Sequence, residues 1–410
     1  MTPAHTAAAQ AARSGYGKLL AYLAAQTRDL AEAEDALADA FAKALDAWPR
    51  TGVPASPEAW LLTAARNRWL DGLRRKRVRS DARDHLTLAL DEAQAQAETH
   101  HDIPDQRLRL IFACAHPAIA PPARAPMILQ TVLGFDAKAI ASAFLVAPAA
   151  MAQRLVRAKA KIRDAGIPFA IPERADLAER LDAALDAVYT VFTRGWGDPL
   201  GADPESRGLA EEAIWLGRLI AQVLPDEPEP KGLLALMLHA HARRAARRDL
   251  GGRFVPLDAQ DVSLWDRPML HEAEALIHQA AAAGRPARFQ LEAAIQSAHA
   301  ARAFTGQADW AAVVILYDGL VAMTGSVVAA INRAVALSRS EGPAQGLAAL
   351  DAVAEDPRLA DYQPYWAARA DLLARTGDKA AAAAAYDRAI GLEFDPALRD
   401  FLQERRAGLG

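Results

Sequence analysis

The sequence predicts an all-α protein, and three observations support this class. Alanine and leucine dominate, glycine and proline fall mostly at junctions, and no run alternates polar and apolar residues for long. Apolar residues recur instead every three or four positions, the spacing of a helix with one buried face. At 410 residues the chain is long enough for two to four domains, each with its own core.

Charge is distributed unevenly along the chain, although the net charge is only −4. Residues 1–165 carry 22 basic and 17 acidic side chains, a net charge of +5, whereas residues 166–410 carry 25 and 34, a net charge of −9. The front of the chain is therefore suited to a polyanion, and the rear is not.

Other features exclude several classes of protein. The single cysteine, Cys114, excludes an internal disulfide and fits a reducing compartment. With His100, His101 and His116 it makes a poor metal site, because no second thiol or helical histidine pair accompanies it. We expect no metal and no cofactor. Without a signal-peptide pattern or an apolar segment of bilayer length, we expect a cytoplasmic protein that does not contact membranes.

Residues 10–80 are expected to form a three-helix unit. The first helix spans 16–26, and Asp29 begins the second, which has a strong apolar face and an acidic exposed face. That acidic face carries Glu32, Glu34, Asp35 and Asp39. It is either a solvated surface near a helix N-terminus or a docking surface for a basic partner, and the residues alone leave both readings open.

The third helix follows a proline- and glycine-rich loop, residues 49–57. Ser56 is the expected N-cap, Pro57 takes the first helical position, and the helix runs to about residue 77. Its predicted buried stripe consists of Leu62, Ala65, Trp69 and Leu73. Between residues 66 and 83 there are eight basic and two acidic side chains, which favours a polyanion-binding helix over an ordinary solvated face.

Residues 81–102 read as a polar linker, and residues 103–166 as a second helical module. Helices are expected over 104–115 and 123–133, followed by a short helix capped by Asp136, a turn at 145–148 and a basic helix over 149–163. That last helix has five basic residues and no acidic one. A short helix, a turn and a basic helix are typical of a helix-turn-helix, with a plain helical hairpin as the alternative.

The rear of the chain divides into a helical region, 172–290, and a repeat region, 291–410. Helices are expected over 177–194, 208–224, 230–248 and 268–283, with Trp196, Trp215 and Trp265 in the core. Helix starts at Asp309, Pro343 and Asp378 are 34 and 35 residues apart, with partner helices over 326–339 and 364–375 and a terminal helix over 396–407. This spacing fits tetratricopeptide-like repeats, whose concave faces usually bind peptides or proteins.

Three stretches carry a resemblance to a known family. AEDALADAF at 33–41, AWLLTAARNRWLDGLRR at 59–75 and AMAQRLVRAKAKIR at 150–163 resemble bacterial extracytoplasmic-function (ECF) sigma factors of the sigma-70 family, over region 2 (residues 10–80) and region 4 (residues 103–166). The other 245 residues resemble the tetratricopeptide-like extension of one ECF subgroup, in which the extension sets activity. One departure is Ala38, where the family usually has glutamine.

The resemblance implies partners and roles. The partners would be core RNA polymerase, through its β′ clamp and β flap, and promoter DNA, with a peptide or protein partner possible for the repeats. Polymerase contacts would come from Glu34, Asp35 and Asp39. Contacts to the −10 element and the melted strand would come from the 48–58 loop and the third helix, at Arg50, Ser56, Arg66, Asn67, Arg74 and Arg75. Contacts to the −35 element would come from Gln153, Arg154, Arg157 and Lys161.

Two other classes of protein compete with this hypothesis. A duplex-binding regulator with a repeat-protein sensor would explain the helix-turn-helix but not the basic third helix. A tetratricopeptide scaffold with incidental basic surfaces would bind neither DNA nor polymerase. An enzyme is not expected, because no nucleophile–base pair, phosphate loop or metal cluster emerges from the sequence.

Overall fold

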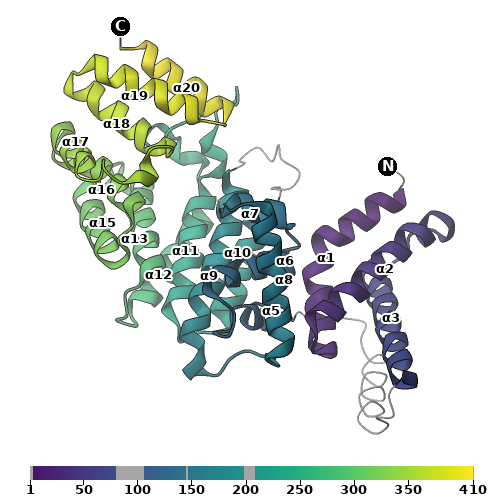
Figure 1. The fold of residues 1–410 in the computed structure, drawn as a ribbon. Coiled ribbons are helices and arrows are strands. Elements are labelled where there is room, and N and C mark those ends of the chain that lie inside the picture. The colour runs from purple at the N-terminus through teal and green to yellow at the C-terminus, as the bar shows by residue number, and fades with distance from the viewer. Residues whose placement is uncertain (1–2, 80–105, 145, 198–207, 410) are drawn as a thin grey trace. The chain divides into compact units, whose positions relative to one another are not determined.

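The computed structural model describes residues 3–79, 106–144, 146–197 and 208–409, and the expected linker at 81–102 lies outside them. The described residues form helices and no strand, apart from one isolated bridge between Arg248 and Phe254 (Figure 1), which confirms the all-α class. The chain divides into two compact units, Met1–Thr190 and Val191–Gly410, called here the front unit and the rear unit. No helix in the described ranges is both long and apolar enough to cross a membrane.

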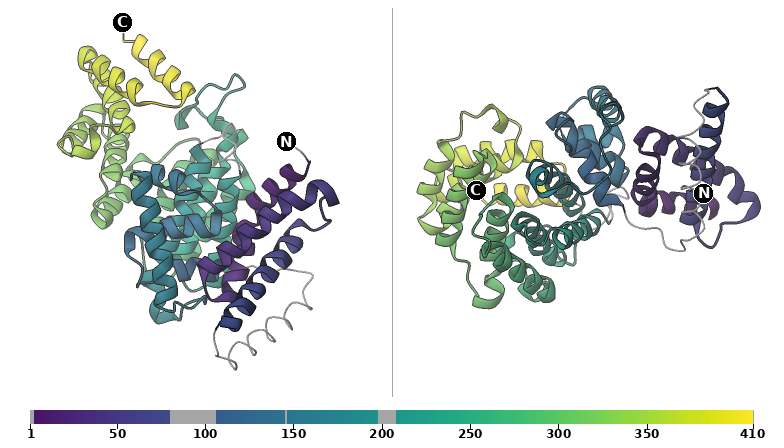
Figure 2. Two further views of the ribbon diagram at one scale, coloured as in Figure 1. Left: turned by 45° about the vertical axis from the view of Figure 1, so that its right-hand side comes forward. Right: turned by 90° about the horizontal axis from the view of Figure 1, so that it is seen from below.

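Three helices begin the front unit: α1 (Pro3–Thr27), α2 (Leu30–Thr51) and α3 (Pro57–Arg79), each in contact with the other two (Figure 2). The predicted start of α2 is confirmed, because the Asp29 carboxylate accepts hydrogen bonds from the backbone N–H groups of Ala31 and Glu32. This cap satisfies donors that the first helical turn leaves without partners. Of the residues expected on the apolar face of α2, Leu30, Ala33, Leu37 and Ala40 are buried, whereas Phe41 is partly covered and Leu45 is 44% exposed.

The loop expected from residue 49 begins later than predicted. Helix α2 continues through Trp48, Pro49 and Arg50 and ends at Gly52, whose φ of +85° suits glycine. Proline fits here because its fixed φ is already helical and only one backbone hydrogen bond is lost. Trp48 is buried against Trp60 of α3 in an edge-to-face contact at 5.6 Å, and this non-local packing extends the helix.

The buried stripe of α3 also differs from the prediction. Ala65 is buried as expected, but Leu61 is buried in place of Leu62, while Trp69 and Leu73 are only partly covered. The stripe is therefore rotated by about one residue at its start, because α3 packs against both α1 and α2 rather than against one neighbour.

The front unit continues with α5 (Arg107–Cys114), α6 (Pro121–Leu133), α7 (Ala137–Ala143) and α8 (Pro148–Asp164). Asp136 caps α7 as predicted, accepting a hydrogen bond from the N–H of Ala139 at 2.6 Å. Helix α8 packs on α6 and α7. Its predicted buried stripe is confirmed in full: Met151, Leu155, Ala158 and Ile162.

Helix α1 also packs on α5 and α6, and one glycine permits the close approach. A Cβ atom added to Gly17 would lie 1.7 Å from the carbonyl oxygen of Val132. Real side chains do not tolerate such a separation, so the α1–α6 contact requires glycine at this position.

Helix α9 (Arg174–Gly197) contains the boundary between the units, whereas the sequence placed the break at residues 166–172. Its first half is buried at Leu177, Leu181 and Leu185. Glu179 accepts a hydrogen bond at 3.1 Å from the buried side chain of Arg124, near the start of α6. The beginning of α9 is therefore part of the front unit.

The first part of the rear unit is built on a central helix, α11 (Pro228–Ala242). This helix packs on α10 (Leu209–Val223), α12 (Arg267–Ala281) and α13 (Arg288–Ala300). The sequence extended α11 to residue 248, but the helix ends at Ala242. Short turns η1 (Arg244–Arg247), η2 (Leu257–Ala259) and η3 (Val262–Leu264) follow it, and α14 (Arg302–Thr305) follows α13. Trp265 is buried as predicted and Trp196 is partly buried, whereas Trp215 is 38% exposed.

The predicted helices at the end of the chain are present: α15 (Trp310–Thr324), α16 (Val327–Ser340), α17 (Pro343–Asp351), α18 (Gln363–Thr376), α19 (Lys379–Leu392) and α20 (Pro396–Ala407). Each helix packs on the next (Figure 1). Side chains of Asp309, Asp378 and Asp395 cap α15, α19 and α20. Small buried residues such as Ala334 and Ala385 allow the close packing of these helices.

Candidate nucleic-acid interface

Helix α8 presents the predicted set of polar side chains on its outer face. Gln153, Arg157 and Lys161 are exposed, and Arg154 is half-buried. The guanidinium of Arg154 donates a hydrogen bond to the carbonyl oxygen of Pro122 at 3.2 Å. The buried stripe on the opposite face fixes this orientation, so these four side chains share one surface.

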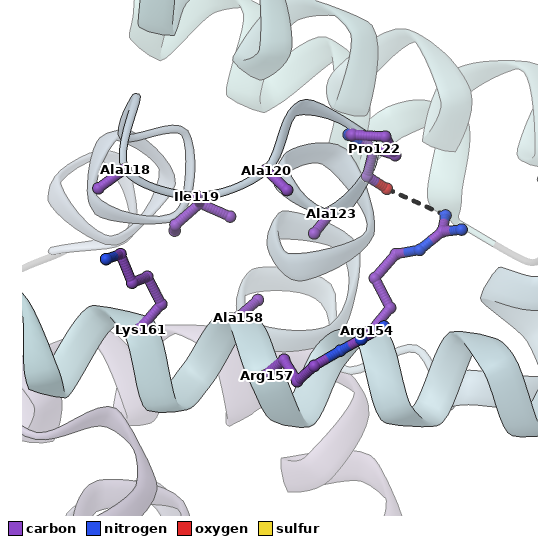
Figure 3. Close-up of a pocket in the computed structure, with 9 residues that line it drawn as sticks. All are labelled: Ala118, Ile119, Ala120, Pro122, Ala123, Arg154, Arg157, Ala158 and Lys161. Atoms are coloured by element: carbon purple, nitrogen blue, oxygen red, sulfur yellow. Dashed lines mark hydrogen bonds between the residues drawn. The ribbon is translucent and has the colours of Figure 1, made fainter.

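Three of these residues line a cleft of about 440 Å³ (Figure 3). Arg154, Arg157 and Lys161 form one side. The other side consists of small and apolar residues at the start of α6 and just before it: Ala118, Ile119, Ala120, Pro122 and Ala123. No lining residue is acidic. A surface with three cations and no carboxylate suits phosphate groups of a polyanion. The sequence did not identify the second side, because its residues carry no polar side chain.

A further cation of α8, Lys159, makes a contact of a different kind. Its Nζ donates a hydrogen bond to Oε2 of Glu34 on α2 at 2.7 Å, and the two side chains are only 19% and 18% exposed. Burial raises the pKa of the Glu34 carboxyl, while Lys159 acts in the opposite direction. The pair therefore joins α2 to α8 inside the front unit, and burial outweighs the attraction of Lys159 in setting the pKa of Glu34.

The three acidic residues predicted on α2 are thus in different environments. Glu34 is half-buried against Lys159, Asp39 forms an ion pair with Arg68 of α3, and Asp35 is exposed. The structure does not bring them together as one open acidic surface. Asp35 is the predicted polymerase contact that solvent reaches most readily.

The basic residues predicted on and before α3 are also divided. Asn67 and Ser56 are exposed, and Arg50 is exposed beside Asp46, with 2.5 Å between their nitrogen and oxygen atoms. Arg66, by contrast, is only 8% exposed, and burial lowers the pKa of its guanidinium. The resemblance implies a DNA contact for Arg66, but the rotated stripe of α3 turns this side chain inward. The side chains of Arg74 and Arg75 lie outside the described residues.

Comparisons with known proteins extend this description. Residues 12–79 match Sigma-70 region 2, and residues 180–281 match a family of unknown function (DUF6596). The uncharacterized protein R00370 of Rhizobium meliloti (strain 1021) is 41% identical over 380 residues, which is 92% of this chain and 88% of that protein. The chain belongs to the same family as R00370. No solved structure matches it.

The first of these matches assigns α1–α3 to a sigma-70 region 2. Three predicted site residues of this domain are exposed and make no ion pair with another described residue: Asp35, Ser56 and Asn67. The last two are neutral polar side chains. Helices α5–α8 lie between the two matched segments, so their role is inferred from their geometry alone.

Proposed function

We propose that the protein is a sigma factor of the ECF subgroup, which binds core RNA polymerase, recognises −35 and −10 promoter elements and opens DNA for transcription initiation. The observation that carries the proposal is that a sigma-70 region 2 and the exposed cationic face of α8 occur in one compact unit. A plain duplex-binding regulator would have no use for region 2.

In this proposal α7 and α8 act as a helix-turn-helix that reads the −35 element. Gln153 and Arg157 are exposed on the face that would enter a major groove, where amide and guanidinium groups can each pair with a base edge. Lys161 and Arg154 lie at the cleft and would contact phosphates, which fix the register of the helix without reading sequence.

Region 2 would open the −10 element. Three exposed polar side chains would take part: Asn67 on α3, Ser56 just before α3, and Arg50 at the end of α2. An extruded base and the displaced strand would bind along this surface. Asn67→Ala should therefore be defective on duplex promoter DNA and largely rescued on a template already mismatched across the −10 region. Equal defects on both templates would count against a role in opening.

Contacts to polymerase would begin at Asp35, because Glu34 and Asp39 are engaged within the chain. Full use of the acidic face would require the α2–α8 contact to open when polymerase binds. Asp35→Lys should reduce co-purification with core polymerase, whereas Glu355→Lys, at an exposed carboxylate of the rear unit, serves as a charge-matched control.

The rear unit is proposed to be a tetratricopeptide-like extension that supports activity. A chain ending at Gly197 keeps all of α9 and should transcribe less than the full chain, and so should a chain that lacks α20. Either truncation transcribing as well as the full protein, while still folded by circular dichroism, would contradict a supporting role.

Run-off transcription tests the proposal as a whole. Core polymerase would be combined with the full chain, or with Arg157→Ala, on a library of genomic promoter fragments. We expect discrete start sites with the full chain and fewer transcripts with the variant. Polymerase activity that is unchanged by adding the protein, despite tight duplex binding, would favour an ordinary DNA-binding regulator instead.

A further inference from the structure

A buried arginine in the rear unit lacks a negative partner. Arg243, at the C-terminal end of α11, is only 8% exposed. Its Nε donates to the carbonyl oxygen of His239 at 3.3 Å, and its Nη2 donates to Oε1 of Gln296 at 2.5 Å. Both acceptors are neutral. No carboxylate of the described residues forms an ion pair with this guanidinium, which is an unfavourable state for a buried charge.

A second arginine reinforces the positive charge. The guanidinium carbons of Arg243 and Arg302 lie 5.9 and 5.3 Å from the ring centroid of the same indole, that of Trp265. Helices α11, α13 and α14 and the turns η1 and η3 meet around this ring. Trp265 is 3% exposed, and its indole N–H has no hydrogen-bond partner in the part of the chain that the structure describes. Arg302 donates to the backbone carbonyl oxygens of Asp258 and Gln260 at 2.6 and 3.1 Å, so it contributes positive charge more than free donors. One unused N–H donor and two cations thus lie at the same indole ring.

Nearby ionisable groups do not compensate this charge. Burial, together with the positive charges of Arg247 and Arg302, lowers the pKa of Arg243 to about 10. Burial, together with Arg243 and Arg302, also lowers the pKa of His299 to about 4, against a smaller opposing effect of Asp258. The Asp258 carboxylate is bound by Arg339 at 2.5 Å, so it is already engaged.

We propose that this cluster, formed by Arg243, Arg302 and Trp265, binds the oxyanion group of a small ligand, a phosphate or a carboxylate. Guanidinium groups are well suited to oxyanions, and here Arg243 would donate to the ligand while Arg302, bound to two backbone carbonyls, would add positive charge. The indole N–H adds a neutral donor, and the aromatic face holds both guanidinium groups in place. The site lies in the segment that matches the family of unknown function and in α14 after it, and it does not depend on the proposed sigma function.

Binding of inorganic phosphate and of acetate to the full chain tests the proposal, at constant ionic strength and low millimolar concentration. Chloride at the same ionic strength is the control, since general salt effects on stability act through the whole surface. We expect calorimetric binding of at least one oxyanion, with a rise in thermal midpoint that chloride does not produce. A larger response to phosphate would identify a phosphate-bearing ligand, and a larger response to acetate a carboxylate.

Two variants assign the effect to this cluster. Arg243→Met should weaken oxyanion binding about tenfold or more, the loss expected for one charge-assisted hydrogen bond, and Arg302→Gln should weaken it less, because it removes a nearby charge. Arg243→Met should also raise the thermal midpoint in buffer without oxyanions, because it removes an uncompensated buried charge. Arg109→Met on α5, an exposed arginine outside both cationic sites, is the matched control and should leave the response unchanged, whereas Arg157→Met measures any oxyanion binding at the α8 cleft.

A spectroscopic readout separates binding from a purely structural role. A bound oxyanion would offset the two guanidinium charges and so raise the pKa of His299, which nuclear magnetic resonance can follow. The proposal is overturned if the full chain responds equally to all three anions, or if Arg243→Met lowers stability in oxyanion-free buffer and keeps the phosphate response. Loss of the response only in the α8 variant would likewise place the oxyanion elsewhere.

Discussion

Arginine has opposite roles in the cleft of the front unit and in the last helices of the rear unit. Arg154 and Arg157 face a cleft with no carboxylate in its lining. In the rear unit, arginines from α16 to α20 form ion pairs with aspartates on neighbouring helices or loops: Arg333–Asp318, Arg369–Asp351, Arg388–Asp361, Arg405–Asp371 and Arg406–Asp387. The pairing of arginines, rather than their number, therefore distinguishes a surface that can accept a polyanion from one that holds helices together.

The largest expected effect concerns where the two units divide. A chain ending at residue 172 loses Leu177, Leu181 and Leu185 from the front unit, and each fully buried leucine contributes about 1.5–3 kcal/mol. Their sum is comparable to the whole stability of a typical domain. We expect the 1–172 chain to lose cooperative unfolding in urea and the 1–197 chain to keep it. Equal unfolding midpoints for both chains would place the start of α9 outside the front unit.

The next effect concerns buried histidines of the rear unit. Burial lowers the pKa of His239 to about 3 and that of His299 to about 4, so the unfolded chain binds protons more tightly than the folded one. Stability should therefore be complete above the unfolded pKa near 6.5 and fall as the pH decreases from there towards 4, by up to about 1.4 kcal/mol per pH unit for each histidine.

Urea denaturation of the rear unit between neutral pH and pH 4, followed by histidine and tryptophan signals, measures this slope. His239→Gln should reduce the slope by the contribution of one proton, whatever it does to stability at neutral pH. A free energy of unfolding that stays constant across this range would contradict the burial of both imidazoles.

A smaller effect is expected on promoter recognition. Arg157→Ala should reduce discrimination at one −35 position by about 1–3 kcal/mol, the range for a bidentate arginine contact to guanine. Arg154→Ala should weaken binding to all sequences alike, because Arg154 is half-buried and held at the Pro122 carbonyl. Competition binding with single-base variants of the −35 element distinguishes the two patterns. Identical profiles for both variants would remove the proposed division between base and phosphate contacts.

The smallest effect is expected for the ion pairs between rear helices. Asp351→Asn removes the partner of Arg369 without changing shape, and pairs exposed to this degree contribute about 0.2–1 kcal/mol. Thermal denaturation at low and high salt should show a small loss that salt abolishes. Glu355→Gln, a nearby exposed carboxylate, is the control. A loss of several kcal/mol would mean that this pair is structurally central.

Local features of the fold could be predicted because their causes are local. Asp29, Asp136, Asp309 and Asp378 begin helices as expected, since a capping carboxylate and the donors it satisfies are within three residues of each other. The buried stripe of α8 could be predicted for the same reason, because its period is set by the helix itself.

Features that depend on distant partners could not be predicted. Pro49 lies inside α2 because Trp48 packs on Trp60, and Arg66 is buried because α3 contacts α1 as well as α2. In the sequence RRAARR, nothing distinguishes Arg243 from the other three arginines, which are only partly buried; its deeper burial follows from Trp265 and α14, which come later in the chain. In the proposed nucleic-acid interface, the basic helix α8 could be predicted from the sequence. The apolar side of the cleft, at the start of α6, could not.

The contact of Gly17 with the Val132 carbonyl has a consequence for the genetics of this protein. Every missense change that one base can make in a glycine codon introduces a Cβ atom, and here that atom has no space. A mutational scan should therefore find position 17 as intolerant as a residue that contacts DNA or polymerase. Such intolerance would result from the close packing of α1 on α6, and it would not be evidence for a binding partner.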